Sequence, residues 1–418
     1  MSNIRAIKGM NDLFEEDLIW WRKITSTAEQ IFQAYGYGEI RTPVLEEAQL
    51  FIRGVGETTD IVEKEMYLFE DRDKKMVCLR PENTAGVVRA LLQHGKIRPD
   101  MDERVYYFGQ MFRRERPQKG RYRQFHQLGV EAFGVAEPSA DVETMAMLHS
   151  FLTELGMKGV NLILNSLGEG AERQKYTLAL KNYFMSHQSS LCEDCQRRLE
   201  KNVLRILDCK AENCKGLGDE APTAIGYLDD ASKQHFDAVE NGLQRLNIPY
   251  TVSHRLVRGL DYYTRTVFEA MAETGLGAQN TVIAGGRYDG LVGQFGGKPT
   301  PAVGFAGGIE RLVLLLKEGA GDLKMACPDL VLVGADDIGR EKATELAFFL
   351  RAKGIFVEVD HKMRSVKAQM RRANRMEARY TMVLGDSEIR KNQADLKNLE
   401  NGNVQEVELE AANVAACL

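Results

Sequence analysis

The sequence lacks several features that would place it in whole classes of protein. No stretch of its 418 residues reaches the ~18 apolar residues that a membrane-spanning helix needs. Residues 1–10 contain no apolar core of signal-peptide length. Its seven cysteines, an odd number in a long chain, fit a reducing compartment better than a disulfide scaffold. We therefore expect a cytoplasmic protein with no membrane association.

Internal repeats, low-complexity tracts and an excess of positive charge are also lacking. Hydrophobic residues make up 44% of the chain, which is ample for a packed core, and the length suggests about two to three domains of ~150 residues. The formal net charge is −5. This value argues against a polyanionic partner, because a basic surface is the usual mark of nucleic-acid binding.

The distribution of charge changes that interpretation. Residues 113–123 hold six basic residues and one acid, a net charge of +5, and residues 362–379 hold seven basic residues and one acid, a net charge of +6. The rest of the chain is then at −16. Clustered guanidinium groups repel one another unless anions lie between them, and the fork of an arginine matches phosphate oxygens.

Apolar periodicity predicts the elements of the first part of the chain. We expect helices at Glu15–Tyr35 and from Pro81 to about His94, with strands at Glu39–Leu45, Met66–Phe69 and Met76–Leu79, and a hairpin of Arg104–Met111 with Tyr122–Phe133. The pattern from Glu137 to about Asn247 is largely helical, strands return between Leu256 and Arg287, and a helix follows at Ile309–Lys317. Hairpin-connected strands interrupted by helices favour an antiparallel α+β domain with an inserted helical module at about residues 170–230.

A second domain is expected after Gly319, Gly321 and Pro328. Strands at Leu330–Val333, Ile355–Val359 and Tyr380–Leu384 alternate with helices at Arg340–Arg351 and Ser365–Glu377, which reads as a small α/β domain. We thus divide the chain into residues 1–325 and 326–418. Five basic residues of the second domain are spaced three or four apart, so they would share one helix face, which is either a solvated face or a phosphate contact: Arg364, Lys367, Arg371, Arg375 and Arg379.

Several motifs resemble those of a known enzyme class. Phe112–Glu115 with its return strand resembles motif 2 of the class II aminoacyl-tRNA synthetases, Gly304–Leu312 resembles motif 3, and Thr42–Pro43 resembles the end of motif 1. Two longer runs, Leu256–Glu269 and Gly285–Leu291, resemble the two signature peptides of the histidyl-tRNA synthetase family. The resemblance extends from Lys8–Asp12 to Gly385–Asp386, and so covers essentially the whole chain.

The resemblance implies a fold and a reaction. The fold would be a six- or seven-stranded antiparallel catalytic sheet flanked by helices, with a C-terminal α/β anticodon-binding domain, in a homodimer. L-Histidine and ATP, with Mg²⁺, would give histidyl-adenylate and pyrophosphate, and the 3′ end of the histidine tRNA would then take the acyl group. Little covalent chemistry is asked of the protein, so positioning and cationic stabilisation should dominate.

Arginines carry most of the implied ATP chemistry. By resemblance, Arg113 clamps the α-phosphate and the substrate carboxylate, Arg311 holds the γ-phosphate, and Arg258 acts at the α-phosphate. The catalytic residues would be Arg258 and Arg113, both of which would also touch the histidine. Glu115 corresponds to the glutamate at the adenine, and Arg121 completes the implied ATP site.

The histidine site needs an anion for the ammonium group and partners for both ring nitrogens. Gln127 and Glu131 lie four apart on one strand and so share a face, and there they would be costly without partners. By resemblance, the other residues of this site are Glu82, Asn83, Thr84, Tyr262, Tyr263 and Tyr288. Glu131 would then accept from one ring nitrogen and Tyr263 would meet the other. His126 faces the opposite way and is expected to be structural.

Four cysteines lie close together in the helical insertion. Cys192, Cys195, Cys209 and Cys214 are separated by two, thirteen and four residues. Four thiols at such a spacing can form a tetrahedral zinc site, but the spacing is less regular than paired CxxC motifs. Reduced cysteines without a metal are our default interpretation, and a structural zinc is the alternative.

Two other functions compete with the enzyme. One is a non-catalytic, synthetase-like regulatory subunit of histidine biosynthesis, which typically lacks the anticodon-binding domain and the signature arginines. Arg113, Arg258 and Arg311 are all present here. The other is a generic RNA-binding protein, which would leave the amino-acid pocket residues unexplained.

Overall fold

The computed structural model describes residues 4–57, 59–98, 102–276, 280–319, 323, 325–362 and 364–418. The chain forms two compact units, Met1–Leu323 and Lys324–Leu418. Gly321, one of the three residues that mark the expected boundary, lies outside the described residues. Among the helices that are described, none has the length and apolar character needed to cross a membrane.

The first unit is built on a large sheet whose strands are β1 (Gly38–Glu39), β5 (Glu103–Phe112), β6 (Gln124–Phe133), β7 (Val160–Ser166), β8 (Tyr250–Val252), β9 (Thr264–Ala272), β10 (Thr281–Arg287) and β11 (Ala302–Gly308). Within the described residues the order is β1-β5-β6-β11-β10-β9-β7-β8. In this order, each pair of neighbouring strands from β5 across the sheet to β7 is antiparallel. The short edge strands β1 and β8 pair in parallel with β5 and β7. The sheet therefore has short edge strands in addition to the expected six or seven. These edge strands are too short to show an alternating apolar pattern in the sequence.

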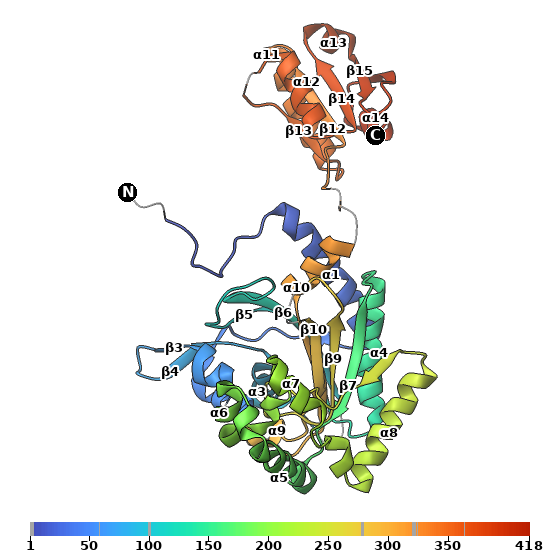
Figure 1. The fold of residues 1–418 in the computed structure, drawn as a ribbon. Helices are drawn as coiled ribbons and strands as arrows, with labels where there is room; N and C mark the ends of the chain where they lie inside the picture. Colours follow the sequence, from blue (N-terminus) through green and yellow to red (C-terminus); the bar gives the residue numbers. More distant parts are fainter. Residues whose placement is uncertain are drawn as a thin grey trace. The chain divides into compact units, whose positions relative to one another are not determined.

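The sheet separates two hydrophobic cores, because successive side chains of a strand point to opposite faces. Leu128 and Val130 of β6 belong to one core, and Phe133 belongs to the other. One face is covered by α1 (Glu15–Ala34), α4 (Pro138–Glu154), α8 (Asp230–Arg245) and α10 (Ile309–Gly319). The other is covered by α3 (Thr84–Gln93), α5 (Gly170–Ser186), α6 (Glu193–Lys201), α7 (Glu212–Asp219) and α9 (Leu291–Gln294) (Figure 1).

Helix α1 shows how the sequence produces one of these covering elements. Trp20, Ile24, Ala28 and Phe32 are spaced four apart and are all buried. Acidic residues occupy its first turn, where the helix dipole favours negative charge. The predicted helix is confirmed to within one residue at its end.

Smaller elements complete the first unit. Strands β2 (Leu45–Glu47), β4 (Met76–Leu79) and β3 (Tyr67–Glu70) form a three-stranded sheet beside α2 (Ala48–Val55) and a π-helical turn at Ile61–Glu65. The insertion contains three short 3₁₀ turns, at Gln188–Ser190, Val203–Ile206 and Ala224–Tyr227. The predicted strand at Glu39–Leu45 is wrong for most of its length, because only its two ends pair in sheets.

The largely helical prediction for Glu137–Asn247 is also wrong at one place. Residues Val160–Ser166 form β7, which pairs with β9. Similarly, β9 begins only at Thr264, so Leu256–Tyr263 is a loop and not part of the predicted strands. A run of seven residues carries too little periodicity to distinguish a buried strand from a helical turn.

Arg287, at the end of β10, is entirely buried in the first unit. Its guanidinium pairs with Asp141 of α4 and donates to the carbonyl oxygens of Val135 at 3.0 Å and Glu137 at 3.2 Å. The buried charge of Arg287 is thus compensated by an ion pair and by hydrogen bonds to the main chain. Arg287 therefore ties the sheet to α4.

The second unit is a five-stranded mixed sheet of order β13-β12-β14-β15-β16 among the described residues. Its elements are β12 (Leu330–Gly334), α11 (Asp337–Arg351), β13 (Val357–Val359), α12 (Val366–Arg375), β14 (Tyr380–Leu384), α13 (Asp386–Lys391), β15 (Gln393–Asn398), β16 (Val404–Glu408) and α14 (Ala411–Ala416). The first three strands are parallel, as the alternating pattern predicts, and the last two are antiparallel.

The basic helix face of the second unit is smaller than expected. Helix α12 carries Lys367, Arg371 and Arg375, all exposed. Arg364 and Arg379 lie beyond its ends and pair with Asp360 at 3.5 Å and Asp329 at 3.1 Å. Three exposed cations, rather than five, therefore share the helix.

Candidate active site

A cleft of 1220 Å³ lies on the face of the sheet that the insertion covers. We call it the arginine cleft, because four of the residues that line it are arginines named from the sequence: Arg113, Arg121, Arg258 and Arg311. Glu115, Gln127 and Phe125 also line it. The structure thus brings together all five residues that were assigned to ATP, although they come from segments nearly 200 residues apart.

Arg113 stands directly after β5 and is oriented by two contacts. Its Nε donates to the carbonyl oxygen of Pro81 at 2.9 Å, and its guanidinium lies 5.1 Å from the ring centroid of Phe125. Such a cation–π contact holds the guanidinium over the ring. The position of Arg113 is therefore set before any ligand arrives.

Positive charge is also concentrated around Arg311, another residue that lines the arginine cleft. Arg311 of α10 donates from Nε to the carbonyl oxygen of Gly120 at 3.0 Å and from Nη1 to that of Thr281. Burial, and next the positive charge of Arg121, lower the pKa of Arg311. Arg121 itself pairs with Glu115 at 2.9 Å. Because like charges repel one another, an anion in the cleft would reduce the repulsion between Arg121 and Arg311.

Arg258 lies on the loop that precedes β9. Its Nη1 pairs with Glu269, and its guanidinium lies 5.2 Å from the ring centroid of Tyr263. Within the described residues its buried Nε has no hydrogen-bond partner. An unsatisfied buried donor is costly, so this nitrogen is available to an acceptor on a ligand.

A cluster of buried side chains adjoins the arginine cleft where Tyr263 packs against Arg258, and we call it the acidic pocket: Glu82, Thr84, Tyr107, Glu131, Tyr262, Tyr263 and Tyr288. At its centre, Glu131 accepts from Thr84 Oγ1 at 2.7 Å and from the hydroxyl of Tyr288. Burial raises the pKa of Glu131 to about 8. This carboxyl group is thus poised to exchange a proton near neutral pH.

Glu82 supplies a second carboxylate to the acidic pocket. It accepts from the main-chain nitrogens of Thr84 at 2.7 Å and Ala85 at 3.0 Å, in the first turn of α3. Burial raises the pKa of Glu82, and its charge in turn raises that of Glu131. Two desolvated acids so placed would be stabilised by a ligand that carries a positive group and hydrogen-bond donors.

Tyrosines and a glycine shape the space around Glu131. The ring centroids of Tyr262 and Tyr263 are 4.7 Å apart, and those of Tyr262 and Tyr288 are 5.6 Å apart. Gly304 of β11 stands opposite Glu131 in the sheet, and a Cβ atom there would overlap the Glu131 carboxylate. The glycine of the third motif therefore makes room for the acid.

Two predicted residues lie differently from the rest. The side-chain oxygen of Asn83 accepts from Thr42 at 2.6 Å and from Arg80 at 3.1 Å, and neither partner belongs to the acidic pocket. Gln127 lines the arginine cleft, and within the described residues its buried Oε1 has no partner. Gln127 thus presents a free acceptor to a ligand, whereas Asn83 fixes the start of α3.

Sequence reasoning missed two residues of the site. The hydroxyl of Tyr107 donates to Glu131 at 3.4 Å, and Glu269 holds both Arg258 and, at 2.7 Å, the hydroxyl of Thr281. Tyr107 lies on the same strand face as Val105, which an apolar period-2 pattern assigns to the core. Only its partner on the neighbouring strand reveals its function.

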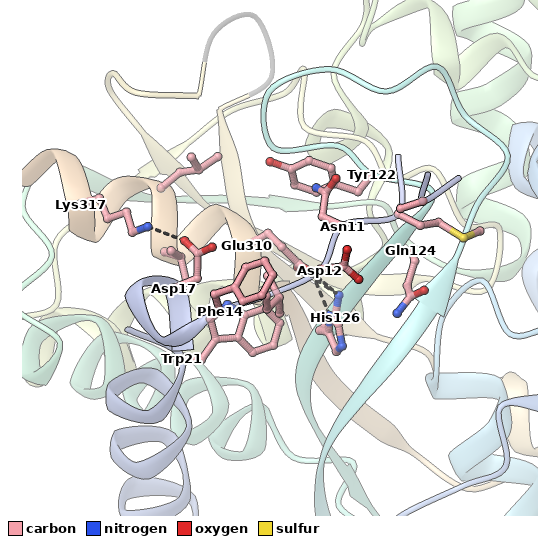
Figure 2. Close-up of a pocket in the computed structure, with 15 residues that line it drawn as sticks. Asn11, Asp12, Phe14, Asp17, Trp21, Tyr122, Gln124, His126, Glu310 and Lys317 are labelled. Carbon is pink, nitrogen blue, oxygen red and sulfur yellow. Dashed lines mark hydrogen bonds and ion pairs between the residues drawn. The ribbon is translucent and has the colours of Figure 1, made fainter. Parts of the chain in front are cut away.

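A smaller hollow of 480 Å³ lies where the N-terminal segment meets β6 and α10. Figure 2 shows His126 there beside Glu310 and Trp21. His126 Nδ1 is 2.9 Å from a carboxylate oxygen of Glu310, and its ring packs edge-on against Trp21 with centroids 4.6 Å apart. His126 thus joins three elements of the fold, in agreement with the structural part expected for it.

Comparisons with known proteins agree with this geometry. The family model described as histidyl-tRNA synthetase matches residues 9–312, and the model described as anticodon binding domain matches residues 329–414. The chain is 47% identical over 397 residues to the histidine--tRNA ligase of Anaeromyxobacter sp. (strain K), covering 95% of each chain. The chain belongs to the histidyl-tRNA synthetase family.

Solved structures of the histidyl-tRNA synthetase family share the fold. The apo histidyl-tRNA synthetase of S. aureus superimposes with a TM-score of 0.82 at 37% identity, covering 98% of each chain. A Bacillus halodurans protein titled as an ATP phosphoribosyltransferase regulatory subunit/histidyl-tRNA synthetase gives a TM-score of 0.64 at 24% identity, covering 88% of this chain and 96% of that one. At that identity the likeness concerns the fold alone.

Proposed function

We propose that this chain is a histidine--tRNA ligase, which activates L-histidine with ATP and transfers it to the 3′ end of the histidine tRNA. The observation that carries the proposal is the contact between two unlike regions. An open cleft lined with arginines suits a polyphosphate, and a buried acidic pocket beside it suits a small cationic ring compound.

In the first step, a carboxylate oxygen of histidine attacks the α-phosphorus of ATP, and the bond to the pyrophosphate oxygen breaks. Negative charge grows on the phosphoryl oxygens, so cations fixed around them lower the barrier. Arg113 and Arg258 meet these oxygens and the histidine carboxylate, and Arg311 holds the γ-phosphate. Glu115 and Arg121 bind the adenine end, and ATP enters as its magnesium complex, held mainly through phosphate oxygens.

The acidic pocket selects the amino acid. Glu82, Thr84 and Gln127 receive the α-ammonium group, Glu131 accepts a hydrogen bond from one ring nitrogen, and Tyr263 meets the other. Tyr262 and Tyr288 close the sides, and Asn83 supports the start of α3. A site that hydrogen-bonds both ring nitrogens rejects an isosteric side chain strongly, because its own buried groups would then lose their partners.

The second unit contacts the anticodon end of the tRNA through phosphates, with Lys367, Arg371 and Arg375 of α12 as the exposed cations. The ribose hydroxyl at the 3′ end of the tRNA then attacks the carbonyl carbon of histidyl-adenylate, and AMP leaves. We place this activity in the cytoplasm and in a homodimer, which is the assembly that the family resemblance implies.

The alternative of a non-catalytic regulatory subunit is less well supported. Curated relatives that are 45–47% identical over nearly their full length bear the name histidine--tRNA ligase. A subunit that only senses histidine would need the acidic pocket but not four arginines gathered around a polyphosphate-sized cleft.

Amino-acid-dependent exchange of pyrophosphate into ATP tests the proposal. Each of the standard amino acids is offered separately to the purified chain, and histidine alone should support exchange. Histidine tRNA should then accept labelled histidine in the presence of ATP. Absence of exchange with histidine, in protein that binds histidine, would favour the regulatory alternative.

A further inference from the structure

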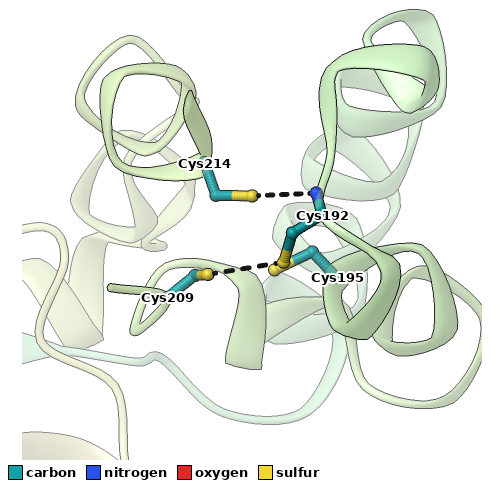
Figure 3. Close-up of side chains that lie close together, drawn as sticks. All are labelled: Cys192, Cys195, Cys209 and Cys214. Carbon is teal, nitrogen blue, oxygen red and sulfur yellow. Dashed lines mark hydrogen bonds between the residues drawn. The ribbon is translucent and has the colours of Figure 1, made fainter. Parts of the chain in front are cut away.

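Four cysteines of the insertion converge on one point. The sulfur atoms of Cys192, Cys195, Cys209 and Cys214 all lie within 4.8 Å of one another, and three of the four residues are buried (Figure 3). The Sγ atoms of Cys192 and Cys209 are 3.8 Å apart. A tetrahedral zinc with Zn–S bonds of about 2.3 Å places its sulfurs about 3.8 Å apart. We propose that these four cysteines bind one zinc ion.

The local structure presents these thiols as metal ligands. Cys192 directly precedes α6 and Cys195 lies in its first turn, while Cys214 lies in the first turn of α7. The first turns of the two helices therefore bring three of the four thiols to one place. In addition, the main-chain nitrogen of Cys192 donates to Cys214 Sγ at 3.2 Å.

The chemistry of the donor set selects the ion. Four soft sulfur donors in a tetrahedron suit zinc, or iron in a single-ion site, and do not suit magnesium or calcium. A disulfide would need sulfurs about 2.05 Å apart and would leave the other two thiols unused in the same small space. Each thiol that ligates releases its proton to solvent, so binding strengthens as pH rises.

The cysteine cluster also supports the loop that carries Arg258. Arg255 of that loop donates to the carbonyl oxygens of Lys215 at 2.9 Å and Leu207 at 3.2 Å, on either side of Cys209 and Cys214. Asn202 donates to Asp261 of the same loop at 3.2 Å. The zinc therefore positions Arg258 by fixing the segment against which its loop packs. This second part rests on the proposed function.

Metal analysis of the purified full-length chain tests the site independently of activity. One zinc per chain is expected, and cobalt taken up in its place should show the intense visible bands of tetrahedral thiolate coordination. Cys209→Ser should lose the metal, whereas Cys327→Ser, at a cysteine of the second unit, should retain it. A folded wild-type chain without zinc after purification in zinc-containing buffer would overturn the site, and so would bound iron.

Should Cys209→Ser fail to fold, the cobalt spectrum of the wild-type chain decides the ligand set by itself. For the positioning effect, removal of zinc by a chelator should lower the rate of adenylate formation about tenfold and leave ATP affinity within twofold. Zinc removal should add little to Arg258→Ala. An unchanged rate would contradict positioning but not the zinc site, and a zinc-loaded chain inactive with histidine would contradict the proposed function instead.

Discussion

The arginine cleft and the acidic pocket adjoin each other, yet they are built on opposite principles. The cleft is open, and two of its cations pair with acids, Arg121 with Glu115 and Arg258 with Glu269, whose places a ligand anion could take. The side chains of the acidic pocket are buried, and Glu131 accepts hydrogen bonds from the neutral donors Thr84 and Tyr288. We therefore propose that an anion bound in the cleft replaces acids as partners of the arginines, whereas a cation bound in the pocket stabilises carboxylates that burial disfavours.

This difference separates rate from selectivity. Groups that meet charge developing during the reaction belong in the cleft, where their contribution falls on the rate. Groups that recognise the ring and ammonium of the amino acid belong in the pocket, where their contribution falls on binding. Variants in the two regions should consequently give distinct kinetic signatures.

Arg258→Ala should have the largest effect. If this cation serves the phosphoryl oxygens in the transition state, as we propose, adenylate formation should slow by about 10²–10³-fold, whereas the Kd values of ATP and histidine should change by only a few-fold. Single-turnover kinetics with separate binding measurements test this. Arg41→Ala, at an exposed arginine, is the matched control and should behave as wild type. Equal losses in ligand binding and in the rate of adenylate formation would contradict a role of Arg258 specific to the transition state.

Glu131→Gln should come next and affect histidine alone. The variant keeps the size of the side chain but cannot give up a proton to become a carboxylate when histidine binds, so histidine affinity should fall by about 10²-fold, equivalent to roughly 2–3 kcal/mol. Calorimetric titration should find ATP affinity unchanged. Tyr288→Phe, which removes one donor to Glu131 and leaves its carboxyl group in place, should give a smaller loss. A comparable fall in ATP affinity would mean that the two regions do not act separately.

The raised pKa of Glu131 also predicts that the stability of the folded chain depends on pH. The pKa of Glu131 is about 8 in the folded chain and ~4.3 when unfolded, so the folded state keeps a proton that the unfolded state releases. Stability without ligand should therefore fall by up to about 1.4 kcal/mol per unit as pH rises between these values. Thermal unfolding should show a smaller decline for Glu131→Gln between pH 6 and 7.5. Parallel declines in both proteins would contradict the raised pKa.

Arg311→Ala should give a moderate effect confined to the nucleotide. Loss of one phosphate contact in an open cleft is expected to raise the KM for ATP by about tenfold, equivalent to ~1.4 kcal/mol. The histidine Kd, measured without ATP, should stay the same. If histidine binding weakened equally, Arg311 would support the fold of both regions rather than hold a phosphate.

The smallest effect is expected in the second unit. Reversal of Arg371 and Arg375 to Glu should lower tRNA charging several-fold, less so at higher salt, where phosphate contacts are screened, and should spare pyrophosphate exchange. Lys353→Glu with Lys397→Glu, at two other exposed lysines of the same unit, is the matched control. Equal charging by the two double variants would identify α12 as a solvated face.

Much of this architecture could be read from the sequence. Helix α1 and strand β4 follow directly from spacing, and the β5–β6 hairpin follows from two long extended runs. Strand β7 could not be found, because a short apolar run between helices has no decisive period. The edge strands β1 and β8 are shorter still, and only their neighbours in the sheet define them.

The site divides in the same way. Gln127 and Glu131 could be singled out because polar residues on an apolar strand face need partners. Tyr107 and Glu269 could not, since their significance lies in contacts with Glu131 and Arg258 that cross between strands and loops. The spacing of the four cysteines allowed a zinc site as the alternative, but their convergence depends on how α6 and α7 fold together, which an uneven spacing cannot decide.

The most direct test of the division between cleft and pocket is a crystal structure of the chain with histidine and a non-hydrolysable ATP analogue. We predict the imidazole ring against Glu131 in the acidic pocket, the α-phosphate between Arg113 and Arg258, and the γ-phosphate at Arg311. A histidine bound outside the pocket, or phosphates that do not meet these arginines, would contradict the account.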